Sequence, residues 1–316
     1  MTRPLAASRA APPSTKAATG ATATAAQPGG WEGYGAAFLG ILVFSLTLPM
    51  SRIAVMELDP FLVGLGRALA AAVPAGLLLW ITRSRLPRRE ERLGIVLAAL
   101  GVVIGWPVAS TLAMQTVPAA HGAVFNGLLP LSTAAFAAWG SGERPPGRFW
   151  LWALAGAALV AVFALREGGG APQSGDLWLL VAVVLGGMGY AEGARVSRTL
   201  GGWRTICWAL VISAPFVAGP VLWMAAHAPA APSPVTWMAL TYLSFGSMFL
   251  GFFFWYRGLA HGGIARVGQV QLLQPFLTVV AAGLLFGETV TWTTLFFAVA
   301  VIGILAAGRR AAARRP

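Results

Sequence analysis

Long apolar stretches alternate with short polar ones between about residues 35 and 307 of this chain. Each stretch approaches the roughly twenty residues that an α-helix needs to cross the apolar interior of a bilayer. We therefore expect an all-α integral membrane protein, in which short loops make neighbouring helices antiparallel. Ten membrane-spanning helices are expected, at about residues 35–55, 61–81, 93–114, 119–139, 149–165, 177–195, 203–224, 235–256, 264–286 and 291–307.

Basic residues gather in every second loop of this pattern. With the amino terminus in the cytoplasm, the cytoplasmic segments hold 19 of the 22 Lys and Arg residues, and the outside loops hold only Arg166. Because Lys and Arg in short loops are retained on the cytoplasmic side, this asymmetry predicts ten spans with both termini in the cytoplasm. The cytoplasmic basic residues are Arg3, Arg9, Lys16, Arg83, Arg85, Arg88, Arg89, Arg92, Arg144, Arg148, Arg195, Arg198, Arg204, Arg257, Arg266, Arg309, Arg310, Arg314 and Arg315.

Two segments in different halves of the chain read as copies of each other. Asn126 lies four residues before Pro130, and Gln271 lies four residues before Pro275. A proline inside a helix deprives the carbonyl four residues earlier of its hydrogen bond. A bilayer tolerates such a carbonyl only where it faces protein or a water-filled cavity. We therefore expect both helices to break at these prolines and to form two walls of one binding cavity.

This repeat puts five helices in each half of the chain. Because five is an odd number, the second half must enter the membrane in the opposite orientation to the first. Inverted repeats are a recurring plan of secondary transporters, with the solute site at the repeat interface. The expected organisation is a disordered cytoplasmic tail at 1–34, five-helix repeats at 35–165 and 177–307, an outside linker at 166–176 and a basic cytoplasmic tail at 308–316.

Composition supports a membrane protein and removes several other classes. The chain is 57% hydrophobic and 10% charged, with a mean hydropathy of +0.73, whereas about a quarter of the residues in soluble domains are charged. The net charge of +12 comes from basic residues spread between apolar runs, so we expect no nucleic-acid partner, which would need a clustered basic patch. The single Cys207 excludes a disulfide framework within the chain, and we expect neither a metal nor a cofactor.

The residues quoted so far resemble those of the two EamA repeats of the drug/metabolite transporter superfamily. The resemblance covers about residues 35–307 and does not identify the solute. It implies a ten-helix, two-repeat bundle around a central cavity lined by the first, third, fourth, sixth, eighth and ninth helices, without a bound cofactor. The seventh expected helix departs from the family pattern, because it has no match to the Asp59-Pro60 start or to Arg67 of the second helix. The matching motifs are Pro130 with Gly142-Glu143, Pro275 with Gly287-Glu288, and Asp59-Pro60-Phe61 followed by Arg67.

Several polar and aromatic residues are candidates for binding a solute. The side chains of Asn126 and Gln271 each donate and accept hydrogen bonds without the cost of a buried charge. The alternative is that they join neighbouring helices, as Asn and Gln often do in membranes. Gln274 lies about one turn from Gln271. The remaining candidates are Trp106, Ser110, Tyr190, Tyr242 and Ser247.

Glu192 is the only acid well inside an apolar stretch, and an intramembrane carboxylate is a candidate proton carrier. The alternative is a structural ion pair with Arg195, three residues later. His121 is expected outside the membrane or at the mouth of the fourth helix, where an exposed histidine is usually inert. A pH-sensing role is the alternative.

Four charged residues near the outer end of the first two helices are expected to form a charge cluster. The cluster would act either as a structural latch or as a contact for a solute carboxylate, because an arginine in a membrane needs a partner. Its members are Arg52, Glu57, Asp59 and Arg67.

These observations favour a secondary transporter that works by alternating access, an exporter of amino-acid-like or other small polar or amphipathic solutes. A membrane-embedded enzyme or a channel is the alternative, but the chain carries no recognised catalytic motif and no ring of charges or filter sequence. The expected partners are the lipid bilayer, a small solute and protons as coupling ion, with the protein a monomer or a homodimer. The expected location is a bacterial inner (plasma) membrane.

Overall fold

The computed structural model describes residues 31–141, 147–167, 171, 173–228, 232–262, 268–287 and 291–313. Helices and the turns between them make up all of these described residues. The first half contains α1 (Trp31–Ser45), α2 (Thr47–Val55), α3 (Pro60–Ile81), α4 (Arg89–Ala98), the π-helix η1 (Ala99–Gly105), α5 (Trp106–Ala113), α6 (Ala119–Asn126), α7 (Leu129–Ser141) and α8 (Gly147–Glu167).

The second half repeats this order of elements. It contains α9 (Ser174–Leu200), α10 (Gly202–Ala226), α11 (Pro234–Thr241), the π-helix η2 (Tyr242–Gly251), α12 (Phe252–Gly262), the 3₁₀-helix η3 (Gly268–Leu273), α14 (Gln274–Phe286) and α15 (Trp292–Ala313).

Seven helical runs in the described residues are long and apolar enough to cross a bilayer. Shorter apolar helices follow at Gln274–Phe286 and Trp292–Ile304. The protein is therefore an all-helical membrane protein. The long runs are Glu32–Val55, Pro60–Ile81, Arg89–Ala113, Ala119–Gly140, Ser174–Leu200, Gly202–Ala226 and Pro234–His261.

Local chemistry explains where α3 begins. The Asp59 carboxylate accepts hydrogen bonds from the backbone N–H groups of Phe61, at 2.8 Å, and Leu62, at 3.2 Å. These N–H groups have no partner within the helix itself, so an Asp at this position caps it. Pro60 supplies a first helical residue whose missing N–H costs nothing there. The Asp59-Pro60 pair thus acts as a helix start.

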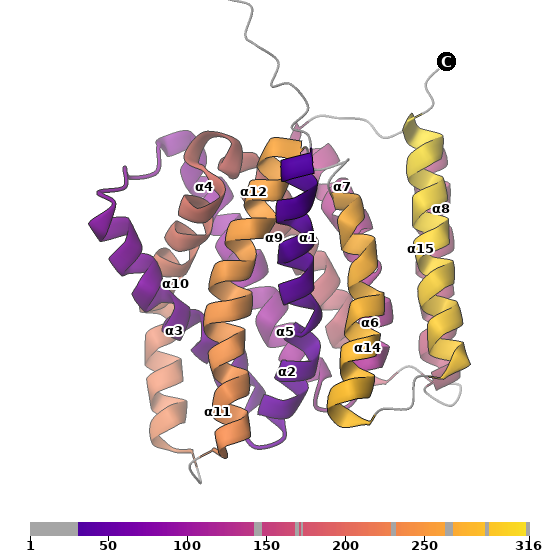
Figure 1. Cartoon of the computed structure of the whole chain (residues 1–316), viewed down its shortest axis with the longest axis horizontal. Coiled ribbons are helices and arrows are strands. Elements are labelled where there is room, and N and C mark those ends of the chain that lie inside the picture. The colour runs from indigo at the N-terminus through magenta and orange to yellow at the C-terminus, as the bar shows by residue number, and fades with distance from the viewer. Residues whose placement is uncertain are drawn as a thin grey trace, which may run out of the picture.

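Helix α9 lies at the centre of the bundle and packs against α4, η1, α5, α6, α7, α10 and α12 (Figure 1). Glycines allow the closest of these approaches. A Cβ atom placed on Gly101 of η1 would lie 2.6 Å from the Gly189 Cα atom of α9, and one on Gly189 would lie 2.8 Å from the Val102 backbone nitrogen. Only glycine therefore permits these two backbones to meet.

Corresponding helices of the two halves pack against each other. Helix α3 packs against α10, α6 packs against α14, and α8 packs against α15. The α8–α15 pair stands at one edge of the bundle in Figure 1, whereas α6 and α14 lie nearer the centre. In the same view α1 begins and α15 ends at the upper end of the bundle. The interface between the halves therefore runs through the whole molecule.

Candidate functional site

Both proline-containing helices are interrupted in the structure. Helix α6 ends at Asn126, and α7 begins three residues later with Pro130 in its first turn. In the second half, the 3₁₀-helix η3 ends at Leu273, and α14 begins at Gln274 with Pro275 in its first turn. Proline suits the first turn of a helix because its missing N–H would have no partner there. Helix α6 packs against α14 and α7 contacts η3, so the two interrupted helices are neighbours.

A small cavity lies in the interior, between helices of both halves. Its volume is about 20 Å³, which is room for water rather than for a metabolite. The described residues that line it are Phe44, Thr47, Arg67, Val102, Trp106, Tyr190, Ser247, Met248, Phe252 and Gln274.

Arg67 is the cation of this cavity. Its side chain comes from the first half of α3 and is 1% exposed. None of its three guanidinium nitrogens meets a hydrogen-bond acceptor among the described residues. Its guanidinium carbon lies 5.5 Å from the centroid of the Trp106 ring, a cation–π contact. An arginine without a partner at the centre of a membrane helix costs about 2.5–3.5 kcal/mol or more. The buried Arg67 side chain therefore destabilises the folded protein.

Two more polar groups of the cavity lack partners in the described part of the chain. They are the indole N–H of Trp106 and the side-chain amide oxygen of Gln274. The Gln274 amide nitrogen donates to the Phe44 carbonyl at 3.4 Å, which fixes the side chain on the cavity wall. The Thr47 and Ser247 hydroxyls share a hydrogen bond of 2.8 Å that joins the two halves. Residues with unsatisfied donors and an unsatisfied acceptor therefore line the same space.

The two π-helices border this cavity from opposite halves. Helix η1 contributes Val102 and is followed by Trp106, whereas η2 contributes Ser247 and Met248 and is followed by Phe252. π-helices are rare and occur frequently at functional sites. The two π-helices lie in corresponding helices of the two halves. Each is followed by an aromatic residue that lines the cavity, Trp106 after η1 and Phe252 after η2.

The sequence pattern of the EamA-like transporter family matches residues 31–165 and again residues 173–307. The chain belongs to the EamA-like transporter family. It is 47% identical over 279 residues to a protein of Bacillus subtilis (strain 168) described as "Uncharacterized transporter YdeK", covering 86% of this chain and 95% of that protein. A solved structure described as "Crystal structure of protein" has the same fold, with a TM-score of 0.60 and 22% identity over 89% of this chain and 98% of the other. The protein is thus a membrane transporter and not an enzyme.

Four of the residues expected to bind solute line the cavity of this EamA-like transporter. They are Trp106, Tyr190, Ser247 and Gln274. The cavity draws on the first, third, sixth, eighth and ninth helices, as the family resemblance implies. In the described residues the second helix contributes Arg67, and the fourth helix contributes no lining residue.

The other four candidates lie away from the cavity lining. Asn126 and Gln271 are 2% and 1% exposed, and their amide nitrogens have no partner among the described residues. The Ser110 hydroxyl donates to the Pro107 carbonyl at 3.0 Å, and the Tyr242 hydroxyl donates to the Val43 carbonyl at 2.6 Å. Ser110 and Tyr242 are therefore already engaged with the backbone in this conformation.

The four residues expected to form an outer charge cluster do not pair with one another. Arg52 donates to the Met114 and Val117 carbonyls, Asp59 caps α3, and Glu57 binds Ser233. Arg67 points into the cavity instead. The expectation fails because backbone groups and a serine, which carry no charge, satisfy the first three. The Gly-Glu motifs cannot be compared, since Gly142, Glu143 and Glu288 lie outside the described residues.

Two polar contacts join the halves at the end of the bundle opposite the start of α1 (Figure 1). Glu57, between α2 and α3, accepts hydrogen bonds from the Ser233 backbone N–H at 2.7 Å and hydroxyl at 2.6 Å. The Ser233 hydroxyl, with its backbone N–H, lowers the pKa of the Glu57 carboxyl below its usual value. The His121 ring lies 2.6 Å from the Asp176 carboxylate, and both side chains are buried. His121 is thus paired inside the protein and not exposed in a loop as expected.

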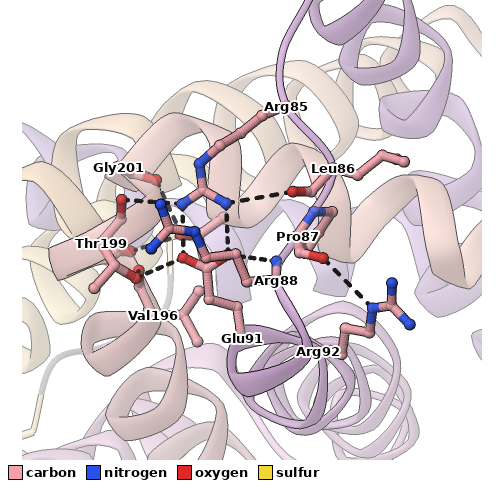
Figure 2. A network of polar contacts seen from close by, with 11 residues as sticks. Arg85, Leu86, Pro87, Arg88, Glu91, Arg92, Val196, Thr199 and Gly201 are labelled. Atoms are coloured by element: carbon pink, nitrogen blue, oxygen red, sulfur yellow. Dashed lines mark hydrogen bonds and ion pairs between the residues drawn. The ribbon is translucent and has the colours of Figure 1, made fainter.

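A polar network centred on Glu91 joins the halves at the end of the bundle where α1 begins (Figure 1, Figure 2). The Glu91 carboxylate accepts two hydrogen bonds from Arg85, at 2.7 and 2.8 Å, and one from the Thr199 hydroxyl of α9, at 2.7 Å. The Arg88 backbone N–H adds a fourth, at 2.8 Å. Hydrogen bonding to Glu91 raises the pKa of Arg85 above its usual value. Four hydrogen bonds therefore satisfy the Glu91 carboxylate and tie α4 to α9.

Glu192 pairs with Arg195 in this EamA-like transporter. Its carboxylate accepts hydrogen bonds of 3.0 and 2.6 Å from the Arg195 guanidinium one turn later. The sequence left two roles open for Glu192, a proton carrier and a structural ion pair with Arg195. The geometry is that of the ion pair. It gives Glu192 a role in the fold at the inner end of α9.

The sequence did not indicate several residues that line the cavity, and it assigned Arg67 to a charge cluster instead of the cavity. Phe44 and Phe252 are apolar residues in apolar helices, so nothing in the sequence separates them from core residues. Thr47 is equally inconspicuous. Arg67 carried a usable signal, because it is the only basic residue in the apolar stretch 61–81 and lies nearly two turns inside it. Because Glu57 and Asp59 lie near Arg67 in the sequence, Arg67 was expected to join them in a charge cluster, and it does not.

Proposed function

We propose that this EamA-like transporter is a secondary exporter of small metabolites that works by alternating access. In this proposal ten helices cross a bacterial inner (plasma) membrane with both termini in the cytoplasm. The two five-helix halves are inverted copies that rock about the central cavity. The pairing of corresponding helices across the molecule supports this plan, because inverted repeats place the solute site at their interface.

The observation that carries the proposal is the closed central cavity with unsatisfied polar groups. Arg67 and Trp106 carry donors, and Gln274 carries an acceptor, that have no partner among the described residues. All three residues line a space that admits only water. Buried polar groups cost free energy unless something binds them. A solute that enters when the cavity widens supplies these partners. A purely structural core has no reason to retain them.

Contacts at both ends explain how access can alternate. The Glu91 network holds the inner end closed, and the Glu57–Ser233 and His121–Asp176 contacts hold the outer end closed. Each joins an element of the first half to one of the second. Opening one end breaks its contacts and leaves those at the other end in place. In this proposal the present conformation, in which the contacts at both ends are made, corresponds to the intermediate between the two open forms.

A cysteine in the cavity tests this scheme without knowledge of the solute. Ser247→Cys is introduced with Cys207→Ala, so that the cavity holds the only thiol. A membrane-impermeant maleimide is then applied to right-side-out or inside-out vesicles. Glu91→Gln weakens the inner contacts and should increase labelling from the cytoplasmic side. Glu57→Gln weakens the outer contacts and should increase labelling from the outside.

Two results would contradict alternating access. Fast labelling from both sides in a single variant would indicate a channel. Labelling from the same side in every variant would show that the two sets of contacts do not control opposite openings. Arg92→Gln is the matched control, because Arg92 is exposed on the same helix as Glu91 and its side chain donates a long hydrogen bond, of 3.4 Å, to the Pro87 carbonyl. It should label as the parent does.

A further inference from the structure

We propose that Arg67 and Trp106 form an oxyanion site for the carboxylate of a small, net monoanionic solute with an apolar or aromatic body. This proposal deepens the proposed transport function and rests on it. It assigns a substrate class to the cavity and gives the arginine in the bundle centre its missing partner.

The donors of the site face the cavity without acceptors. Arg67 is 1% exposed, and its three guanidinium nitrogens have no hydrogen-bond partner among the described residues. The Trp106 indole N–H also lacks one, and the two side chains are adjacent. A planar guanidinium binds a carboxylate through two parallel N–H···O bonds. An oxyanion in the cavity can therefore satisfy both residues at once.

The remaining walls fit an apolar or aromatic body. Phe44 and Phe252 lie 5.0 Å apart between ring centroids, and Tyr190 lies 6.0 Å from Phe252 and 6.4 Å from Phe44. Rings at these separations make favourable edge or offset contacts. Another ring or a branched apolar group can take the place of one of these contacts when the cavity widens.

The charge of the lining selects a net anion over a zwitterion. No acidic side chain lines the cavity in the described part of the chain, so the ammonium group of an amino acid would lack a charged partner beside Arg67. The partnerless acceptor that the cavity does offer is the neutral Gln274 amide oxygen, which suits a hydroxyl. One arginine also matches one negative charge, whereas a phosphate dianion needs further cationic donors.

The site must widen before such a solute can bind, because its present volume of about 20 Å³ is too small. The Thr47–Ser247 hydrogen bond crosses the cavity between the two halves and is the contact to be broken. The structure therefore represents a contracted form of the cavity. Solute binding should favour a wider form.

The test is ligand-induced thermal stabilisation of the purified protein in detergent with four matched probes. Phenyllactate has the carboxylate, the hydroxyl and the ring. Phenyllactamide lacks the charge, phenylalanine replaces the hydroxyl with an ammonium group, and phenyl phosphate replaces the carboxylate with a dianion. We expect saturable stabilisation by phenyllactate, and at least about tenfold weaker binding of the amide, because hydrogen bonds to a charged group are lost.

Variants assign the effect to Arg67. Arg67→Met should abolish stabilisation by phenyllactate, and Arg67→Lys should weaken it, because lysine keeps the charge without the two-pronged geometry. Arg198→Met is the control, since Arg198 is exposed at the inner end of α9. It removes the same charge and should bind as the parent does.

A second measurement does not depend on the choice of probe. Arg67→Met removes a buried charge that has no hydrogen-bond acceptor among the described residues, so it should raise the melting temperature of the protein without solute. A melting temperature lowered by several degrees would show that Arg67 supports the fold, and would overturn the proposal. No stabilisation by phenyllactate, or stronger stabilisation by the amide, phenylalanine or phenyl phosphate, would overturn it as well.

The outcome separates this site from the transport function. Stabilisation that depends on Arg67, together with cavity labelling from one side only, would leave the oxyanion site standing and refute alternating access. Alternating labelling with no dependence on Arg67 would do the reverse.

Discussion

Among single residues, the buried charged side chains Glu91 and Arg67 differ in the hydrogen bonds that the rest of the protein makes to them. Glu91 is buried and accepts four hydrogen bonds, from Arg85, Thr199 and the Arg88 backbone. Arg67 is more deeply buried and has none among the described residues. Removing a partner from a buried charge is costly, so the first arrangement serves the fold. The second is consistent with a residue kept for a ligand.

Asn126 and Gln271 give a prediction at the same scale. Their amide nitrogens are buried without partners beside the two helix breaks, and we expect them to contact the solute when the cavity widens. Asn126→Leu and Gln271→Leu should each raise the concentration for half-maximal uptake into proteoliposomes several-fold, which corresponds to about 0.5–1.5 kcal/mol for a lost hydrogen bond. Unchanged uptake in both variants at normal expression would show that they only join helices.

Residue roles were only partly predictable from the sequence. Trp106, Tyr190, Ser247 and Gln274 could be identified, because polar and aromatic residues in apolar helices need a reason to be there. The partners of Arg67, Glu57 and His121 could not, since they depend on which distant helices meet. His121 and Asp176 are 55 residues apart in the chain.

At the scale of elements, close packing on α9 depends on glycine. The backbones of η1 and α9 meet at Gly101 and Gly189, where a Cβ on either residue would collide with backbone atoms. Backbone atoms cannot move aside as the end of a flexible side chain can. The π-helix η1 is held against α9 at this point, and η1 leads directly into Trp106 on the cavity wall.

Gly189→Ala should therefore destabilise the protein by about 1–3 kcal/mol, the usual cost of forcing extra volume into a packed core. The change is measured as a lower melting temperature in detergent. Gly219→Ala in α10 is the control, since a Cβ there meets nothing within 4 Å. It should leave stability unchanged or slightly raised, because alanine favours helix. Equal melting temperatures for the two variants would contradict the close contact.

At the scale of the whole molecule, the ten-helix expectation is met in part. Seven runs are long and apolar enough to span a bilayer, and shorter apolar helices complete the order that hydropathy predicts. The alternation of apolar and polar stretches was enough to find these helices, because a bilayer fixes their length. The breaks at Pro130 and Pro275 had a signal in the sequence. The π-helices had none, and neither did the packing of α3 against α10 or of α8 against α15.

Reporter fusions test the proposed topology directly. A reporter placed after Gly169 should lie outside the cell, and one placed after Ala307 should lie in the cytoplasm, because the basic residues divide the loops in this way. An enzyme active only in the cytoplasm and one active only outside it give opposite signals at each site. Finding both fusions on the same side would rule out five spans in the second half, and with them the inverted repeat.

The charge of Arg67 has an electrical consequence. A carrier that returns empty takes a positive charge through part of the membrane field, whereas a carrier loaded with a monoanion is neutral at its centre. Moving one charge through the full field changes the free energy by about 2.3 kcal/mol per 100 mV. In a cell that is negative inside, the potential pulls the empty, positive site toward the cytoplasm and leaves the loaded step unopposed. Voltage alone would then drive net export of the anion, without any coupling ion.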